Sequence, residues 1–207
     1  MKRDFDTAAT TWDKDDARTR MSLTIADAMI ASLNLQGSET VLDYGSGTGT
    51  VAFRLQPHVK RVLAADSSRG MLDVLAEKAK KGGVTNVQAL LLDLEQGVPA
   101  LEVSPDVIVS AMALHHIADT GRFASVLYGL LPSGGKIALA DLDTESGDFH
   151  SDNTGVEHFG FDRSAMTKLF TDAGFTDVQF QTAYRITRPN AASIEKNYTI
   201  FLLTARK

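Results

Sequence analysis

The 207-residue chain has the length of one α/β domain, 1–207, and its 43% hydrophobic and 23% charged residues are typical of an ordinary globular protein. Its formal net charge of −5 disfavours nucleic acid as a partner, and the lack of cysteine excludes disulfides and thiolate metal sites. No run reaches the ~18 apolar residues of a membrane span and the N-terminus is too polar for a signal peptide, so we expect no membrane association and a cytoplasmic location.

Helical and extended segments alternate along the chain. A helix that carries Met21, Ile25 and Met29 on one face precedes the first strand. The predicted strands are short, continuous and apolar, as parallel strands buried on both faces are. They cover residues 40–44, 61–65, 87–92, 106–111 and 135–142. Helical spacing of apolar residues at 123–131 and 166–173 completes the pattern of a largely parallel sheet covered by helices.

The last third of the chain departs from this alternation. Two extended segments, 177–188 and 198–206, are joined by a short loop with Pro189 and Asn190 that leaves no room for a crossover helix. We therefore expect the two strands to pair antiparallel. The polar insertion at 144–160 precedes a helix, and loops of this length inside a compact domain are often functional.

A glycine-rich turn follows the first predicted strand in the stretch VLDYGSGTGTVAF. Gly45, Gly47 and Gly49 carry no Cβ, so backbone amides and a helix N-terminus can approach a ligand closely. In open α/β sheets, ligands bind outside the carboxyl ends of the strands. The turn therefore predicts a nucleotide-type site, although a tight strand-to-helix turn without a ligand would give the same pattern.

Acidic residues at strand ends strengthen the prediction of a nucleotide-type ligand. Asp66 closes the second strand, where a carboxylate can accept hydrogen bonds from both ribose hydroxyls. Asp93 follows the third strand and could accept from an exocyclic adenine amine while the Leu94 amide donates to the ring, and Asp43 could bind an ammonium group. One aspartate at a strand end is usually a turn former or a helix cap. Three aspartates beside one glycine loop favour a bound ligand over three separate turns or caps.

In this order and spacing, the segments VLDYGSGTG, VLAADSSRGML, LLLDLEQ, PDVIVSAMALHHI and LLPSGGKIALADL resemble the motifs of class I S-adenosylmethionine-dependent methyltransferases that act on small molecules. The resemblance runs from about Val41 to Leu142. It implies a Rossmann-like three-layer α/β sandwich, whose seven-stranded, mostly parallel sheet has an antiparallel C-terminal strand. It also implies that S-adenosyl-L-methionine is bound by Asp43, Tyr44, Gly45, Ser46, Gly47, Gly49, Asp66, Ser67, Met71, Asp93, Leu94, Ser110 and Ala111.

The resemblance implies a role for each group of these residues. The glycine loop and Asp43 would surround the methionine part of the cofactor, and Asp66 would hold the ribose. Ser67 and Met71 would flank the adenine, whose edge Asp93 and Leu94 would read. Ser110 and Ala111 would lie beneath the sulfonium centre.

Histidines are the candidates for a general base, which is needed only if the acceptor does not readily lose its proton. His116 is the first choice, and His115 and His158 are the other candidates. For each, a hydrogen-bonded surface or loop histidine is the alternative.

The acceptor site is expected outside the cofactor motifs. The N-terminal segment 1–33 would form a helical lid whose Phe5 and Trp12 contact the acceptor, or these aromatic residues are packing anchors. The insertion 144–160 leaves the fifth strand at its carboxyl end, so its side chains should face the same cleft, and Phe159 would contact the acceptor. These side chains are Phe149, His150, Glu157, His158 and Phe159. The acidic residues of the insertion indicate a neutral or cationic acceptor.

Two other functions remain open at this point. A nicotinamide-dependent oxidoreductase could use Asp66 equally well, but Thr50 stands where the dinucleotide fingerprint requires its third glycine. A protein that binds the cofactor without catalysis would show the same motifs. A metal is not expected, because Ser110 and Ala111 end the fourth strand where a magnesium-dependent enzyme needs a carboxylate. The acceptor atom and the oligomeric state are left open.

Overall fold

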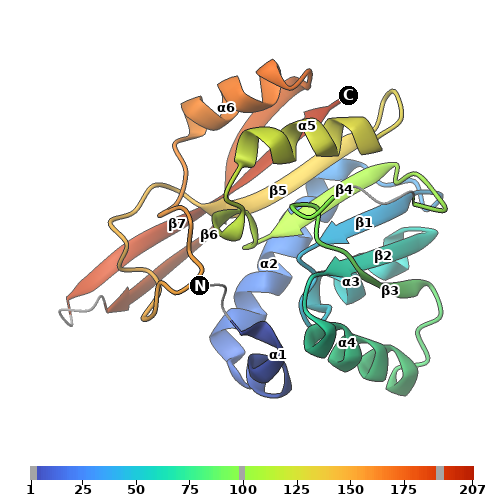
Figure 1. Ribbon diagram of the computed structural model, residues 1–207, viewed down its shortest axis with the longest axis horizontal. Helices are drawn as coiled ribbons and strands as arrows, with labels where there is room; N and C mark the ends of the chain where they lie inside the picture. The colour runs from blue at the N-terminus through green and yellow to red at the C-terminus, as the bar shows by residue number, and fades with distance from the viewer. Residues whose placement is uncertain (1–3, 98–100, 190–193) are drawn as a thin grey trace.

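The structure is a computed structural model that describes residues 4–97, 101–189 and 194–207 (Figure 1). Asn190 of the predicted loop and the first three residues of the predicted lid lie outside these ranges. Within the described ranges, no helix has both the length and the apolar character that a bilayer span requires.

One seven-stranded sheet forms the centre of the molecule, with the strand order β3-β2-β1-β4-β5-β7-β6. Its strands are β1 (Thr40–Tyr44), β2 (Arg61–Asp66), β3 (Val87–Leu91), β4 (Val107–Ala111), β5 (Lys136–Leu142), β6 (Thr176–Pro189) and β7 (Glu195–Arg206). The first five strands pair in parallel, and β7 pairs antiparallel with both β5 and β6. This confirms the predicted mostly parallel sheet with an antiparallel C-terminal strand.

Helices cover both faces of the sheet and complete three layers (Figure 1). They are α1 (Phe5–Ala8), η1 (Ala9–Lys14), α2 (Asp16–Leu33), α3 (Thr50–Leu55), η2 (Gln56–His58), α4 (Arg69–Lys81), η3 (Leu114–His116), α5 (Thr120–Leu130) and α6 (Arg163–Asp172). Buried residues of α2 and α3 form one core with the sheet, and those of α5 and α6 form a second core on the opposite face.

The side chains of strand β1 alternate between the two cores. All of its residues are buried, and side chains alternate between the faces of a strand. Val41 packs in the core under α2 and α3, whereas Leu42 and Tyr44 pack in the core under α5 and α6. By this alternation, Asp43 faces the α2 and α3 side, just before the glycine loop.

Strand β3 differs from the prediction of a strand buried on both faces. It ends at Leu91 rather than at residue 92, and it forms one edge of the sheet. The side chain of Leu91 is 49% exposed. An apolar run of this length predicts a strand, but it does not tell an edge strand from a central one.

The two C-terminal strands form a hairpin that extends beyond the other strands (Figure 1). Their pairing continues from Thr176↔Arg206 to Pro189↔Glu195, with register shifts between Thr176 and Gln179 and between Thr182 and Tyr184. Because β6 is long, its last residues reach past the carboxyl end of β5. This brings Ile186, Thr187 and Arg188 to the wall of the cavity described next.

Candidate active site

A cavity of about 940 Å³ opens at the carboxyl ends of β1, β2 and β4. Most of the predicted site residues line it: Phe5, Trp12, Asp43, Tyr44, Gly45, Ser46, Gly47, Asp66, Ser67, Met71, Asp93, Ala111, His115 and His116. The predicted residues that are not on its wall are Gly49, Leu94, Ser110, His158 and Phe159. The fold thus brings the glycine loop, the acidic residues and two histidines to one cavity.

The glycine loop is tied to β2 by its backbone. The amides of Gly45 and Ser46 both donate to the Ala65 carbonyl, at 2.8 and 3.0 Å. Gly45 has a φ of +73°, and a Cβ on it would lie 2.5 Å from the Cβ of Ala113. Glycine at this position therefore lets the turn after β4 approach the loop that ends β1.

Gly49 serves packing. It precedes α3 with a φ of +89°, and an added Cβ would lie 2.8 Å from the Phe53 side chain and 2.9 Å from that of Leu75. This close contact between α3 and α4 explains the third glycine without a ligand.

Asp66 is held by backbone amides from two segments. Its Oδ2 accepts from the Gly47 amide at 2.8 Å, and its Oδ1 accepts from the Ser68 amide at 2.8 Å. Burial raises the pKa of this carboxyl, against the opposing effect of the amide hydrogen bonds. Each carboxylate oxygen has a second lone pair, so both oxygens can accept from a further donor in the cavity.

Asp43 and Ser46 present buried polar atoms that lack a partner. Asp43 is 1% exposed, and its Oδ2 and the Ser46 hydroxyl have no hydrogen bond within the described part of the chain. Burial, together with the nearby Asp66, raises the pKa of Asp43 to about 7. An unpaired buried carboxyl costs free energy, and a cationic donor in the cavity would remove that cost. These residues fit the amino-acid part of the expected cofactor.

Leu94 and Ser110 support Tyr44 rather than facing the cavity. The Ser110 hydroxyl donates to the Tyr44 carbonyl at 2.8 Å, and the Leu94 amide lies 3.4 Å from the Tyr44 hydroxyl oxygen. Burial raises the pKa of Tyr44 well above its ordinary value. Asp93 does line the cavity, where it accepts from the Glu95 amide at 3.0 Å.

His115 forms a buried pair with Asp141 at the end of β5. Its Nδ1 lies 2.8 Å from Oδ1 of Asp141, and its backbone amide donates to Oδ2 at 3.1 Å. Burial by itself would raise the pKa of Asp141, but the charge and the hydrogen bond of His115 hold it below its ordinary value. The ionised carboxylate accepts from the Nδ1 hydrogen, which fixes the orientation of the His115 ring.

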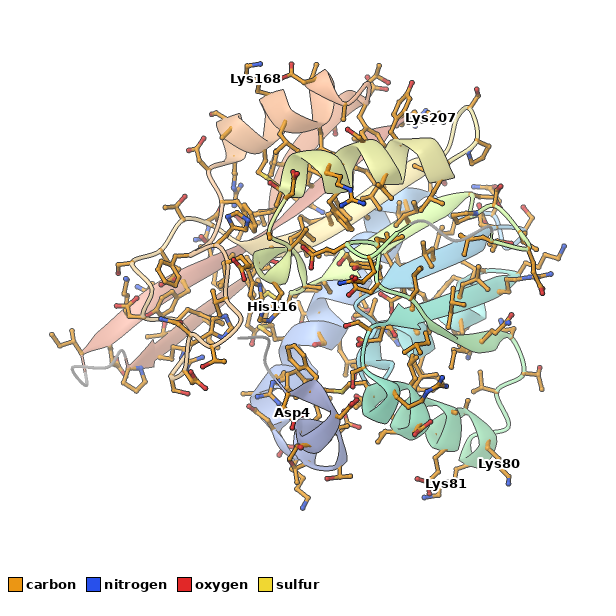
Figure 2. The ribbon with its side chains drawn as sticks, in the orientation of Figure 1. Asp4, Lys80, Lys81, His116, Lys168 and Lys207 are labelled. Carbon is orange, nitrogen blue, oxygen red and sulfur yellow. The ribbon has the colours of Figure 1, made fainter. Side chains whose placement is uncertain are left out.

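His116 lies near the centre of the molecule, between the turn after β4 and the N-terminal helices (Figure 2). Its Nδ1 donates to the Gly155 carbonyl at 2.6 Å, and since a carbonyl can only accept, the neutral ring carries its proton on Nδ1. The ring centroid lies 4.1 Å from that of His115 and 5.3 Å from that of Phe5. His116 is thus fixed between the buried pair and the N-terminal segment.

The histidine and phenylalanine predicted from the insertion lie elsewhere. His158 Nε2 donates to the Ile117 carbonyl at 2.8 Å, and its ring packs against Phe161. Phe159 is 46% exposed. The insertion does line the cavity through Phe149, His150 and Glu157, which were expected to face it.

The N-terminal segment lies across the cofactor motifs. Asp6 Oδ1 accepts from the Gly70 amide at the start of α4, at 2.8 Å. Asp13 accepts from the Thr48 hydroxyl of the glycine loop at 2.6 Å and pairs with Lys78 at 3.0 Å. These contacts place Phe5 and Trp12, whose rings meet edge to face at 5.9 Å, on the cavity wall.

Several site residues were not predicted from the sequence: Asp6, Asp13, Arg18, Met112, Asp141 and Arg188. Asp141 carried a signal, because an acidic residue inside the apolar strand KIALADL needs a buried partner. Met112 lines the cavity with a φ of +56°, a backbone conformation that side chains other than glycine rarely adopt. Within the described ranges, no group of histidines and acidic residues could hold a metal ion.

Comparison with known proteins identifies related sequences and folds. Residues 41–135 match the family model described as a methyltransferase domain. An uncharacterized methyltransferase of Schizosaccharomyces pombe is 32% identical over 154 residues, which are 68% of this chain and 54% of that protein. The chain therefore spans about half the length of this relative.

Solved structures show the same fold at low sequence identity. A putative methyltransferase from Bacillus halodurans superposes with a TM-score of 0.74 at 20% identity, over 88% of this chain and 98% of that one. Phosphoethanolamine N-methyltransferase 2 of Haemonchus contortus, in complex with S-adenosyl-L-methionine, gives 0.70 at 17% identity, over 88% of this chain and 52% of that one. By its fold, motifs and relatives, the chain belongs to the class I S-adenosylmethionine-dependent methyltransferases.

Proposed function

We propose that this protein transfers the methyl group of S-adenosyl-L-methionine to a small-molecule acceptor. The observation that carries the proposal is the pair of acidic residues beside the glycine loop. Asp43 has a buried oxygen without a partner, and Asp66 has both oxygens oriented by backbone amides on the cavity wall. Together they suit a ligand with an ammonium group and a ribose.

Other residues on the wall complete the proposed cofactor site. Ser46 would bind the amino-acid part with Asp43, while Ser67 and Met71 would flank the adenine. Asp93 would accept from the exocyclic amine. Leu94, Gly49 and Ser110 act indirectly in this proposal, because their contacts support Tyr44 and the helix packing.

When bound, the cofactor supplies a methyl group that its sulfonium already activates. The protein's own part is then to align the acceptor and to exclude water, and alignment can supply up to ~7–11 kcal/mol of the barrier. We propose that α1, η1 and the start of α2 serve as the lid, with Phe5 and Trp12 against the acceptor. The insertion would close the opposite side through Phe149 and His150.

His116 remains our candidate for the general base. Its Nδ1 hydrogen bond to Gly155 leaves Nε2 as the proton-accepting atom. The buried His115–Asp141 pair packs against its ring and would keep it in position. His158 is not part of this proposal, because its ring donates to the Ile117 carbonyl and His158 is not on the cavity wall. A cytoplasmic location, a single domain and the absence of a nucleic-acid partner remain predictions from the sequence.

The first experiment separates cofactor classes. S-Adenosylhomocysteine should raise the melting temperature by binding the folded state, whereas NADH should not. The reverse ranking would favour the oxidoreductase.

The second experiment measures S-adenosylhomocysteine release across a panel of small-molecule acceptors. His116→Ala should lower turnover with unchanged affinity for the cofactor, and full activity in this variant would remove the general-base role. Cofactor binding with no turnover across all acceptor classes would favour a non-catalytic binding protein.

A further inference from the structure

Two arginines from opposite ends of the chain line the cavity. Arg18 belongs to α2, and Arg188 lies near the carboxyl end of β6. Strand β6 is the edge of the sheet opposite to β3, four strands away from β1 and its glycine loop. The arginine from β6 therefore belongs to the part of the cavity that the proposed cofactor residues leave for an acceptor.

The position of Arg18 is fixed by its neighbours. Its Nη1 donates to the Trp12 carbonyl at 3.0 Å, and its Nη2 lies 3.3 Å from Oδ2 of Asp15. The guanidinium carbon also lies 4.1 Å from the centroid of the Trp12 ring. A guanidinium has five N–H donors, so these contacts orient Arg18 and still leave donors for a ligand.

Arg188 is half-buried and lies against an aromatic ring. Its guanidinium carbon is 4.8 Å from the centroid of Phe149. Among the ion pairs of the described residues, none joins Arg188 to a carboxylate. A cation on a partly enclosed wall is less screened than one on an open surface, so it attracts an anionic ligand more strongly.

Asp15 shows that the two guanidinium groups act on one region. Its pKa is lowered first by the hydrogen bond from the Arg18 amide and then by the positive charges of Arg18 and Arg188. One carboxylate thus faces two cations, so the sum of charges over Asp15, Arg18 and Arg188 is positive. Asp15 is also largely exposed, so solvent screens its charge.

The acidic residues of the insertion do not reverse this balance. Glu145 accepts three backbone amides of its own loop, and Asp148 forms an ion pair with Lys196. Asp152 and Glu157 do line the cavity, but both are exposed to solvent. The acidic side chains of the insertion led to the expectation of a neutral or cationic acceptor. In the structure, Glu145 and Asp148 have partners within the protein, and solvent screens the charges of Asp152 and Glu157.

We propose that the acceptor is a small molecule with an oxyanion, a carboxylate or a phosphate, which Arg188 and Arg18 bind. Trp12 and Phe149 would contact the apolar body of the same molecule. The planar guanidinium fork matches both oxyanions, because it can donate two parallel hydrogen bonds. This inference rests on the proposed methyl transfer, since it takes the remainder of the cavity as the acceptor site.

The test compares charged and uncharged aromatic probes, of which benzoate and benzamide have the same shape. Benzoate, phenyl phosphate and the uncharged benzamide are titrated by ligand-observed NMR into the 207-residue chain, with and without saturating S-adenosylhomocysteine. At least one anion should bind at least tenfold more tightly than benzamide, and the tighter anion identifies the group. Arg188→Gln should remove this preference, and Arg188→Lys should keep part of it because the charge remains.

Arg185→Gln is the matched control, because Arg185 lies on the same strand but is exposed and is not on the cavity wall. Anion affinity should be unchanged in this variant. Binding of both anions no tighter than that of benzamide, or an anion affinity that Arg188→Gln and Arg18→Gln both leave unchanged, would overturn the oxyanion site. Failure of S-adenosylhomocysteine to bind the unmodified protein would instead overturn the proposed methyl transfer, so the two failures are distinguishable.

Discussion

Asp43 gives the most specific prediction, because its carboxyl is buried beside the glycine loop with a pKa raised to about 7 by burial and by Asp66. In the ligand-free protein this carboxyl is about 90% ionised at pH 8 and about 10% ionised at pH 6. The ammonium group of the cofactor favours the ionised form. The affinity for S-adenosylhomocysteine should therefore fall about tenfold from pH 8 to pH 6, or about 1.4 kcal/mol.

Isothermal titration calorimetry at pH 6, 7 and 8 measures this change. Asp43→Asn is the control, because it keeps the shape of the side chain and removes its charge. The variant should bind more weakly than the unmodified protein at pH 8, and its affinity should not follow the same pH dependence. A flat profile for the unmodified protein, or full affinity in the variant at pH 8, would refute the role of Asp43.

The same carboxyl should affect the stability of the ligand-free protein. Its folded pKa of about 7 exceeds the ordinary value of 3.8, so the folded state binds more protons between these two pH values. Stability from this group therefore falls as the pH rises through this window, by up to about 4 kcal/mol. Asp43→Asn should raise the free energy of unfolding in urea at pH 8 and have little effect near pH 4. No stabilisation at pH 8 would mean that the carboxyl is not desolvated.

Three further substitutions test other parts of the site. Gly49→Ala should lower the free energy of unfolding in urea by about 1–3 kcal/mol, because its φ of +89° and the close Leu75 side chain disfavour a Cβ; an unchanged midpoint would contradict the packing role. Asp66→Ala should weaken S-adenosylhomocysteine binding at least about tenfold in calorimetry while circular dichroism stays native, and unchanged affinity would remove the ribose assignment. Asp6→Ala should speed amide hydrogen exchange across α1 and η1 several-fold, since it removes the bond to the Gly70 amide; equal exchange would show that other contacts hold the segment.

The order of strands and helices could be predicted because it depends on local patterns. Continuous apolar runs marked the parallel strands, and the short connection between residues 188 and 198 of the two predicted segments required β6 and β7 to pair antiparallel. The position of β3 at the edge could not be predicted, because its apolar residues are like those of a central strand. Only the sheet order shows that Leu91 faces solvent.

The cofactor side of the site was more predictable than the acceptor side. Asp43, the glycines and Asp66 lie in short segments whose spacing already indicates a shared cavity. Arg18 and Arg188 are brought together by tertiary structure, and nothing near either residue in the sequence indicates the other. The direction in which a side chain points could also not be predicted. His158 follows the cavity-lining residue Glu157 in the sequence, but its ring is hydrogen-bonded to the Ile117 carbonyl.

A crystal structure of the protein with S-adenosylhomocysteine would test the central claim most directly. We predict that the adenosyl group occupies the cavity at the carboxyl ends of β1, β2 and β4, with the ribose hydroxyls on Asp66 and the amino group on Asp43. Electron density for the ligand at another place, or a cavity that stays empty at saturating ligand, would contradict the account.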